Sequence, residues 1–179
     1  MSSLPLIVEK LQTAQQSLLS TADRIESAFW NTPPNAKSWS AAQLVAHLCQ
    51  AERSILAYAD RVTRKPALAV AFFRRFHLPI RLVESRIVKA KSPMAIESET
   101  LASKETMIAA LRGVRERTLS FLEETREHDL SAYGWPHPFL GRLNFYEWFT
   151  FIAAHQVRHT KQLVEIARNL PNRVASSQK

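Results

Sequence analysis

Apolar residues recur in alternating steps of three and four along four stretches of the chain, which is the period of an amphipathic helix. The first stretch runs from Leu4 to Trp30 and stops at a loop with two adjacent prolines, which cannot continue a helix. The second runs to about Arg61 and begins at Ser40, where Gln43 stands three residues later as a predicted capping box. These patterns predict two long helices joined by a proline-containing loop.

A third helix is predicted over 103–126, or from Thr100 if it begins earlier, and a fourth over 144–169. The connection 127–143 contains two glycines and two prolines, so we expect a loop there. Gly113 stands inside the third helix, where glycine costs about 1 kcal/mol relative to alanine. A close approach of another helix at Gly113 would explain why a glycine occupies this position.

The segment 61–99 departs from this regular pattern, because three prolines break its apolar clusters. It fits either short helices or an irregular excursion, and we interpret it as an insertion between the second and third helices. It also holds most of the positive charge of the chain. Residues 60–92 contain nine Lys or Arg and two acidic residues, a net charge of +7, whereas the whole chain carries +8.

Length and composition point to one all-α domain. The chain has 179 residues, of which 46% are hydrophobic, and about 100–200 residues is the usual size of a single domain. We assign 1–179 to this domain, with a frayed tail over 171–179. Only three glycines occur, which is too few for the many tight turns of a sheet-rich fold. We therefore predict an all-α four-helix bundle.

The same sequence indicates where the protein resides. No stretch of about 20 predominantly apolar residues is present, which excludes a transmembrane helix. The N-terminus lacks the basic start and apolar core of a signal peptide. Cys49 is the only cysteine, so an intramolecular disulfide is impossible. These features predict a cytoplasmic protein.

Two histidines, His155 and His159, occupy the apolar stripe of the fourth helix four residues apart, so both rings project from one face. His47 lies on or beside the apolar stripe of the second helix and could complete a set of three ligands for one metal ion. Three protein ligands leave positions open for water or substrate, as in catalytic sites. Buried histidines that hydrogen-bond to their neighbours are an equally good interpretation of the spacing alone.

For three other residues that carry polar groups we expect a structural role rather than metal binding. Gln43 is expected to cap its helix rather than to support His47. Cys49 points away from His47 on an ideal helix and is expected to be a small buried residue. His137 is expected to anchor the loop before the fourth helix by a hydrogen bond rather than to bind a metal.

Two separated motifs resemble those of a known family. The residues HPFLGRLNFYEW (137–148) and HQVRHTKQL (155–163) look like the C-terminal signature of the DinB-like metal-binding four-helix bundles, and WSAAQLVAHL (39–48) resembles their second-helix signature. The resemblance implies a bundle with two long crossing connections and a divalent metal ion held by His47, His155 and His159. Zinc or nickel is the expected ion, and iron or manganese is also compatible.

Members of this family that are known enzymes include thiol-dependent S-transferases and a thiol-dependent isomerase, and homodimers are common among them. The resemblance therefore implies a homodimeric, metal-dependent enzyme of the S-transferase or hydrolase type. Its metal would activate a thiol or water toward a small-molecule substrate, and a low-molecular-weight thiol is an expected partner.

The alternative is a noncatalytic bundle that binds a partner protein, an anionic lipid surface or nucleic acid through the basic segment 60–92. No helix-turn-helix, zinc-finger or RNA-binding motif supports nucleic acid. In an enzyme, the same segment could instead steer an anionic substrate toward the metal. The candidates for this steering are Arg74, Arg75 and Arg81.

Overall fold

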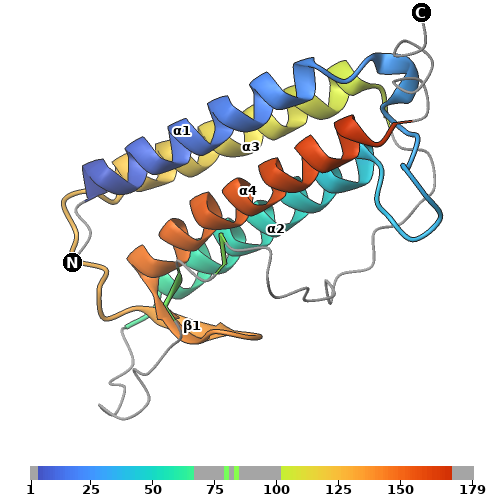
Figure 1. The fold of residues 1–179 in the computed structure, drawn as a ribbon. Coiled ribbons are helices and arrows are strands. Elements are labelled where there is room, and N and C mark those ends of the chain that lie inside the picture. The colour runs from blue at the N-terminus through green and yellow to red at the C-terminus, as the bar shows by residue number, and fades with distance from the viewer. Residues whose placement is uncertain (1–3, 67–78, 81–82, 85–101, 171–179) are drawn as a thin grey trace, which may run out of the picture.

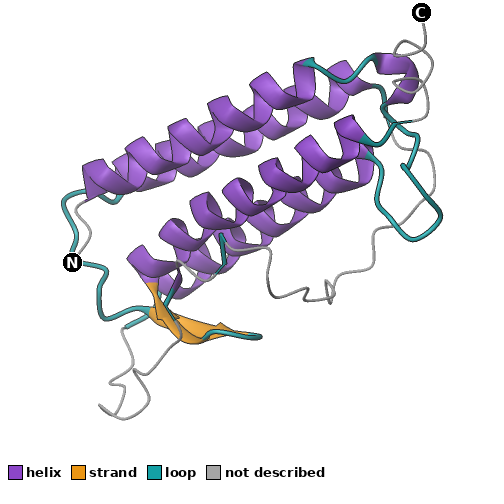
Figure 2. Ribbon diagram, viewed as in Figure 1, coloured by secondary structure: helices purple, strands orange, loops and turns teal. Residues whose placement is uncertain are grey.

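Four long helices and a short β-hairpin make up the part of the chain that the structure describes, which is residues 4–66, 79–80, 83–84 and 102–170. In this computed structural model the helices form an elongated bundle with the hairpin at one end (Figure 1, Figure 2). The predicted all-α four-helix bundle is confirmed. The elements are α1 (Leu4–Asp23), the 3₁₀ turn η1 (Ser27–Phe29), α2 (Ala41–Thr63), α3 (Lys104–Glu124), β1 (Gly134–His137), β2 (Gly141–Asn144) and α4 (Phe145–Arg168).

Helices α1 and α4 run in one direction along the bundle, and α2 and α3 run in the other (Figure 1). The main packed pairs are α1–α4, α2–α3 and α2–α4, with a smaller contact between α1 and α3. Because α2 and α3 are parallel neighbours, the end of α2 and the start of α3 lie at opposite ends of the bundle (Figure 1). The resemblance implied two such crossings, whereas the described ends of the helices require only this one.

The predicted start of α2 is present. The Gln43 backbone N–H donates to Ser40 Oγ at 3.2 Å, and the Ser40 N–H donates to Gln43 Oε1 at 2.9 Å, which forms the capping box. A second capping box joins Asn144 and Glu147 at the start of α4. Both helices that carry the candidate histidines therefore begin at a capping residue, Ser40 for α2 and Asn144 for α4.

The first helix is shorter than predicted. α1 ends at Asp23 rather than at Trp30, and η1 follows it. Ile25 and Trp30 are nevertheless buried, and the indole N–H of Trp30 donates to Met107 Sδ at 3.4 Å. The apolar pattern of the sequence therefore extends past the end of α1, because Ile25 and Trp30 pack on the core from the turn that follows the helix.

Helix α3 begins at the later of the two predicted positions. Ser103 caps it, and its Oγ accepts a hydrogen bond from the Thr106 backbone N–H at 3.3 Å. The close helix approach expected at Gly113 is wrong, because no described atom from outside the local helix backbone lies within 4 Å of the place where a Cβ would stand. Nothing in the described part of the chain therefore requires a glycine at this position.

The connection between α3 and α4 contains an antiparallel hairpin, so the prediction of a loop without regular structure is wrong here. Gly134 pairs with Asn144 at the base of the hairpin and His137 pairs with Gly141 at its turn. Gly141 has a φ of 90°, a conformation that favours glycine. The turn is therefore built on one of the glycines that the sequence pattern attributed to a loop.

Two tryptophans attach the hairpin to the bundle. The rings of Trp135 in β1 and Trp148 in α4 stack with centroids 5.1 Å apart. The Trp148 indole N–H donates to the Trp135 carbonyl oxygen at 3.1 Å. Both side chains are buried, so the hairpin is fixed to the first turn of α4.

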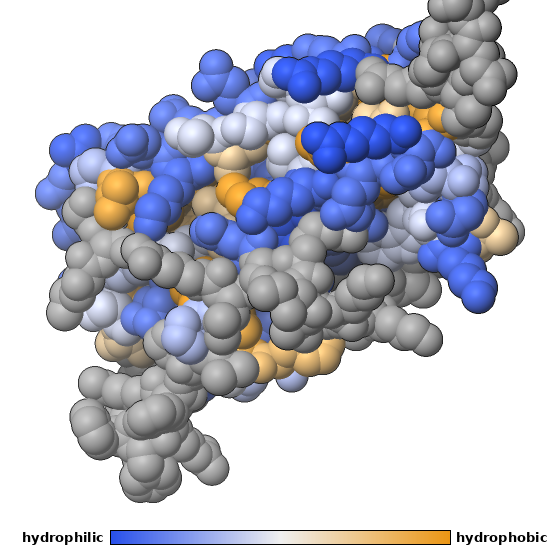
Figure 3. All heavy atoms as spheres, viewed as in Figure 1, coloured by the Kyte–Doolittle hydropathy of each residue, from blue (hydrophilic) through white to orange (hydrophobic). Residues whose placement is uncertain are grey.

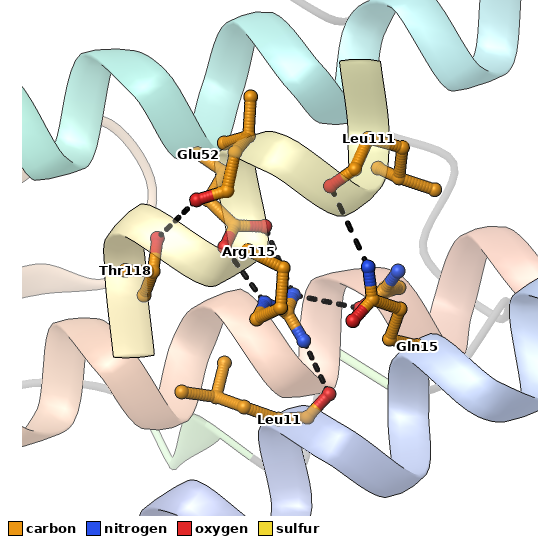
Figure 4. A network of polar contacts seen from close by, with 8 residues as sticks. Leu11, Gln15, Glu52, Leu111, Arg115 and Thr118 are labelled. Carbon is orange, nitrogen blue, oxygen red and sulfur yellow. Dashed lines mark hydrogen bonds and ion pairs between the residues drawn. The ribbon is translucent and has the colours of Figure 1, made fainter. Parts of the chain in front are cut away.

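Two apolar clusters fill the two ends of the bundle, and buried polar side chains lie between them. At this level the guanidinium of Arg115 on α3 donates to Glu52 of α2, to Gln156 of α4 and to the Leu11 carbonyl oxygen of α1 (Figure 4). The two contacts with the Glu52 carboxylate measure 2.7 and 2.9 Å. One buried side chain therefore connects all four helices.

A small part of the predicted insertion 61–99 lies against α4. Ile80 and Val83 pack on the apolar core. The Val83 carbonyl accepts a hydrogen bond from Arg158 at 3.4 Å, and the Glu84 carbonyl accepts one from Lys161 at 2.9 Å. Most of the insertion lies outside the described residues, together with the predicted tail 171–179 and the steering candidates Arg74, Arg75 and Arg81.

The surface in Figure 3 is mostly hydrophilic, with small hydrophobic areas among the coloured residues. Within the described part, the large hydrophobic side chains that are exposed are Leu6 at 40% and Phe139 at 55%. None of the described helices is long and apolar enough to cross a bilayer. The apolar stripes of the helices are therefore used mainly for packing within the bundle.

Candidate metal centre

Three histidines from two helices converge on one point inside the bundle. The Nε2 atom of His155 lies 3.3 Å from Nε2 of His47 and 3.0 Å from Nε2 of His159. Ligand atoms of all three residues lie within 4.8 Å of one another. His155 and His159 are one helical turn apart on α4, and the antiparallel packing of α2 places His47 beside them. The structure thus brings together the three residues that the sequence analysis singled out.

The spacing of these nitrogens fits a metal ion better than it fits a hydrogen-bonded cluster. A neutral imidazole nitrogen has either one hydrogen or one lone pair, so Nε2 of His155 cannot make two good hydrogen bonds at once. A cation needs only lone pairs, and all three nitrogens can supply one. Nitrogens 2.0–2.1 Å from a tetrahedral ion stand about 3.3 Å apart. The observed separations are close to that value, so the three residues fit a divalent ion that accepts imidazole ligands.

A hydrogen bond fixes the orientation of His159. Its Nδ1 lies 3.0 Å from Oε1 of Gln162, and an amide oxygen can only accept, so Nδ1 carries the hydrogen. The lone pair of Nε2 then faces His155, which is the tautomer that a metal ligand needs. The sequence analysis missed Gln162, although its place three residues after His159 on the same helical face is a usable signal.

The second nitrogen of His47 has no comparable partner. Its Nδ1 is buried and makes no hydrogen bond within the described residues. Gln43, one turn earlier on α2, is engaged in the capping box, as expected. Packing against neighbouring rings, rather than a hydrogen bond, therefore holds this imidazole in place.

Aromatic side chains pack against the three histidines on two sides. Trp39 stacks over His159 with centroids 6.3 Å apart, and its ring lies 5.2 Å from that of His47. Phe151, one turn before His155 on α4, stacks on that ring with centroids 5.2 Å apart. These contacts restrict the rotation of all three imidazoles and keep much of their surface away from water.

Burial keeps the imidazoles of His47 and His155 neutral. Desolvation lowers the pKa of His47 from its ordinary value of 6.5 to about 4. The pKa of His155 lies well below 6.5, first because of burial and then because a protonated His155 would be repelled by protonated neighbouring histidines and by Arg158. Neutral imidazole is the form that binds metal, so these residues are in the ligating state at neutral pH.

Cys49 takes no part in this cluster, although it stands two residues after His47. It is buried, and burial raises the pKa of its thiol to about 11. A thiol in this environment stays protonated and unreactive. Its role as a small buried residue agrees with the sequence-based expectation.

His137 anchors the turn of the hairpin, as expected. Its Nδ1 accepts hydrogen bonds from the backbone N–H groups of Phe139 at 3.1 Å and Leu140 at 3.2 Å. It is not one of the histidines whose ligand atoms converge. Its contacts with α4 are instead made with aromatic rings, first with Phe151 and then with Trp148.

Comparison with known proteins finds a sequence relative and structural neighbours that are four-helix bundles. The uncharacterized protein YuaE of Bacillus subtilis (strain 168) is 26% identical over 141 residues, which cover 78% of this chain and 84% of that protein. The crystal structure of TT2238, described as a four-helix bundle protein, matches with a TM-score of 0.56 and 20% identity over 90% of this chain and 98% of that chain. YfiT from Bacillus subtilis, described as a probable metal-dependent hydrolase with an unusual four-helix bundle topology, matches with a TM-score of 0.63 and 16% identity over 94% of this chain and 89% of that chain.

A family model gives the assignment. The model of the DinB superfamily matches residues 10–163, a range that contains all three converging histidines and all four helices except the ends of α1 and α4. This match agrees with the two motifs that suggested the resemblance. The chain belongs to the DinB superfamily.

Proposed function

We propose that this protein is a metal-dependent enzyme in which His47, His155 and His159 hold one divalent ion, and that it activates a thiol or water for attack on a small electrophilic molecule. The convergence of three Nε2 atoms at separations suited to one ion carries this proposal. The description of YfiT as a probable metal-dependent hydrolase supports metal dependence, and at 16% identity it says nothing about the substrate of this chain.

A bound divalent ion lowers the pKa of a coordinated thiol or water, so that a nucleophile forms near neutral pH. The protein contributes three neutral imidazoles, and a set of three leaves coordination positions open for the nucleophile and substrate. Gln162 keeps His159 in the correct tautomer. The rings of Trp39 and Phe151 keep water away from two sides of the centre, which strengthens electrostatic interactions inside it.

The nucleophile comes from solution rather than from the protein. Cys49 is buried with a raised thiol pKa, and no carboxylate belongs to the converging group within the described residues. A low-molecular-weight thiol would give S-transfer to an electrophilic carbon, and water would give hydrolysis. Zinc or nickel is the ion we expect first, and cellular supply as well as affinity decides between them.

A turnover assay on metal-stripped and reconstituted protein tests this proposal. Zinc- or nickel-reconstituted protein is mixed with low-molecular-weight thiols and an electrophilic dye, and separately with an activated ester. We expect turnover in at least one assay that disappears after chelation and in His159→Ala. His128→Ala, at an exposed histidine, is the matched control and should retain turnover. Turnover that survives both chelation and His159→Ala would overturn the proposal.

A further inference from the structure

Arg115 of α3 makes a polar link between the two helices that carry the three histidines. Its guanidinium donates to both carboxylate oxygens of Glu52 on α2, at 2.7 and 2.9 Å. The nitrogen that makes the 2.9 Å contact also donates to Oε1 of Gln156 on α4, at 2.8 Å. Glu52 stands five residues after His47, and Gln156 directly follows His155. The link therefore lies within about two helical turns of the converging histidines along both helices.

The histidines do not set their own spacing before an ion binds. His159 presents a lone pair on Nε2, so the hydrogen on Nε2 of His155 is directed to His159, at 3.0 Å within α4. The 3.3 Å contact from His155 to His47 on α2 is then not a second good hydrogen bond. Another contact has to place α2 against α4.

A metal centre tolerates little error in this placement. Sliding α2 by one residue along α4 would displace His47 by about 1.5 Å. A functional side chain has to be held within about 0.5 Å of its working position. The register of the two helices therefore decides whether three nitrogens can meet one ion.

The composition of the network suits positioning better than stability. Arg115 and Glu52 are 1% and 4% exposed, so both charged groups have lost their hydration. The amide nitrogen of Gln156 is buried and makes no hydrogen bond within the described residues, which is a further cost. Apolar side chains in place of a buried ion pair are often equally stable or more stable. Hydrogen bonds add direction, because they form at one register, whereas apolar stripes can pack at several.

We infer that Arg115 is a positioning residue of the candidate metal centre, which holds α2 and α4 at the register where their histidines converge. This inference rests on the proposed function and gives a role in it to a side chain that lies outside the ligand set. Figure 4 shows the guanidinium between Glu52 of α2 and the Leu11 carbonyl oxygen of α1. Because the guanidinium is planar and rigid, these partners fix the direction in which it meets Gln156.

Two variants remove the link without leaving a buried charge unpaired. Arg115→Met combined with Glu52→Leu replaces the ion pair by apolar side chains. Gln156→Leu keeps the ion pair and cuts only its connection to α4. Leu122→Ala is the matched control, because Leu122 is fully buried on α3, seven residues after Arg115, and takes no part in the network. It removes packing and leaves every bond of the link in place.

The affinity for cobalt(II) is measured by competition with a chelating dye, at a temperature where circular dichroism shows each variant to be folded. We expect the double variant and Gln156→Leu to bind cobalt about 10–100-fold more weakly, the usual effect of losing groups that support metal ligands. The visible absorption of the bound cobalt should change as well, because it reports the coordination geometry. Leu122→Ala should keep both affinity and spectrum. Unchanged affinity and spectrum in both link variants, or an equal loss in Leu122→Ala, would overturn the inference.

A second measurement does not depend on the metal. Nitroxide labels at Ser54→Cys on α2 and Arg168→Cys on α4, both exposed positions, are introduced in a Cys49→Ala background. Electron paramagnetic resonance of the metal-free protein then gives the distribution of distances between the two helices. We expect one narrow distribution with the link intact and in Leu122→Ala, and a broader or shifted one in the double variant.

The two measurements separate the inference from the proposed function. A distribution that broadens or shifts in the double variant supports the inference even if cobalt does not bind to the unmodified protein, which would count against the proposed function alone. The same narrow distribution with and without the link would overturn the inference and leave the proposed function standing.

Discussion

Gln162 determines which nitrogen of His159 faces the centre, through the hydrogen bond from Nδ1 at 3.0 Å. Gln162→Leu removes this acceptor and frees the ring to adopt the other tautomer. Loss of such a partner typically lowers metal affinity by about 10–100-fold. Competition with a chelating dye measures the affinity. Gln50→Leu, on the exposed side of α2, is the matched control and should bind like the unmodified protein. Equal affinity in Gln162→Leu would contradict this role.

His47 makes the stability of the metal-free protein depend on pH. Its pKa is about 4 in the folded state and about 6.5 when unfolded, so between these values only the unfolded chain binds the proton. The free energy of unfolding is therefore highest above about pH 6.5 and decreases as the pH falls toward 4. The decrease is roughly 1.4 kcal/mol for each unit by which the folded and unfolded pKa values differ. His155 and His137 are shifted in the same direction.

Urea unfolding of the metal-free protein at several pH values between about 7 and 5 measures this dependence. The free energy of unfolding should decrease over that range, and His47→Leu should make the decrease smaller. His128→Ala, which changes an exposed histidine, should leave the slope unchanged. A stability that is flat with pH would mean that His47 is accessible to protons in the folded state.

Sequence spacing predicts the three histidines but not their surroundings. His155 and His159 stand four residues apart in an apolar stripe, which is a local signal. Trp39 and Phe151 reach the centre partly through contacts across helices, and no spacing within one helix reveals where Trp39 packs. The ligand set could therefore be proposed from the sequence, whereas the aromatic walls required the structure.

Within α3, Gly113 weakens a helix without any packing reason in the described part of the chain. No described atom from outside the local helix backbone lies within 4 Å of a Cβ at this position, so an added methyl group meets nothing there. Gly113→Ala should raise the free energy of unfolding by up to about 1 kcal/mol, because alanine has the higher helix propensity. Thermal or urea unfolding measures the change. A loss of stability would show that another part of the chain approaches α3 here.

The hairpin is the element that sequence patterns predict least well. β1 and β2 have four residues each, which is too short to show a clear alternation, and Pro136 within β1 argues against a strand. The hairpin is stabilised from outside, by the stacking of Trp135 on Trp148 of α4. The capping box of α2 was predicted, and that of α4 was missed although its signal is equally local, because each depends on residues only three positions apart.

At the scale of the whole molecule, the Arg115 network holds the four helices in register. Arg115 is 1% exposed and Glu52 4% exposed. Removing one partner of such a pair leaves an uncompensated buried charge, so Arg115→Met should lower the free energy of unfolding by about 3–5 kcal/mol. Urea unfolding monitored by circular dichroism measures the loss.

Two further variants distinguish this effect from a general sensitivity to charge changes. In Arg115→Met combined with Glu52→Leu no buried charge is left unpaired, so the double variant should be more stable than Arg115→Met alone. Asp60→Asn weakens the exposed pair with Arg64 and should leave the free energy of unfolding nearly unchanged, because exposed pairs contribute little. A double variant as unstable as Arg115→Met would show that the network contributes through packing rather than charge.

The sequence predicts the number and approximate position of the helices, but not their directions in the bundle. An apolar stripe looks the same whichever way its helix runs, so the parallel packing of α2 and α3 could not be read from periodicity. The long segment 61–99 agrees with the parallel packing of α2 and α3, because two consecutive helices that run in the same direction need a long connection. The direction of α2 matters for the site, because it brings His47, near the start of α2, beside the middle of α4.

The metal content of protein purified without an affinity tag tests the central claim most directly. Elemental analysis should find about one divalent ion per chain in the unmodified protein and in His128→Ala. His47→Ala, His155→Ala and His159→Ala should each lose most of that ion, because two remaining imidazoles hold a metal weakly. Full metal occupancy in both His155→Ala and His159→Ala, or no bound metal in the unmodified protein after exposure to zinc and nickel, would contradict the account.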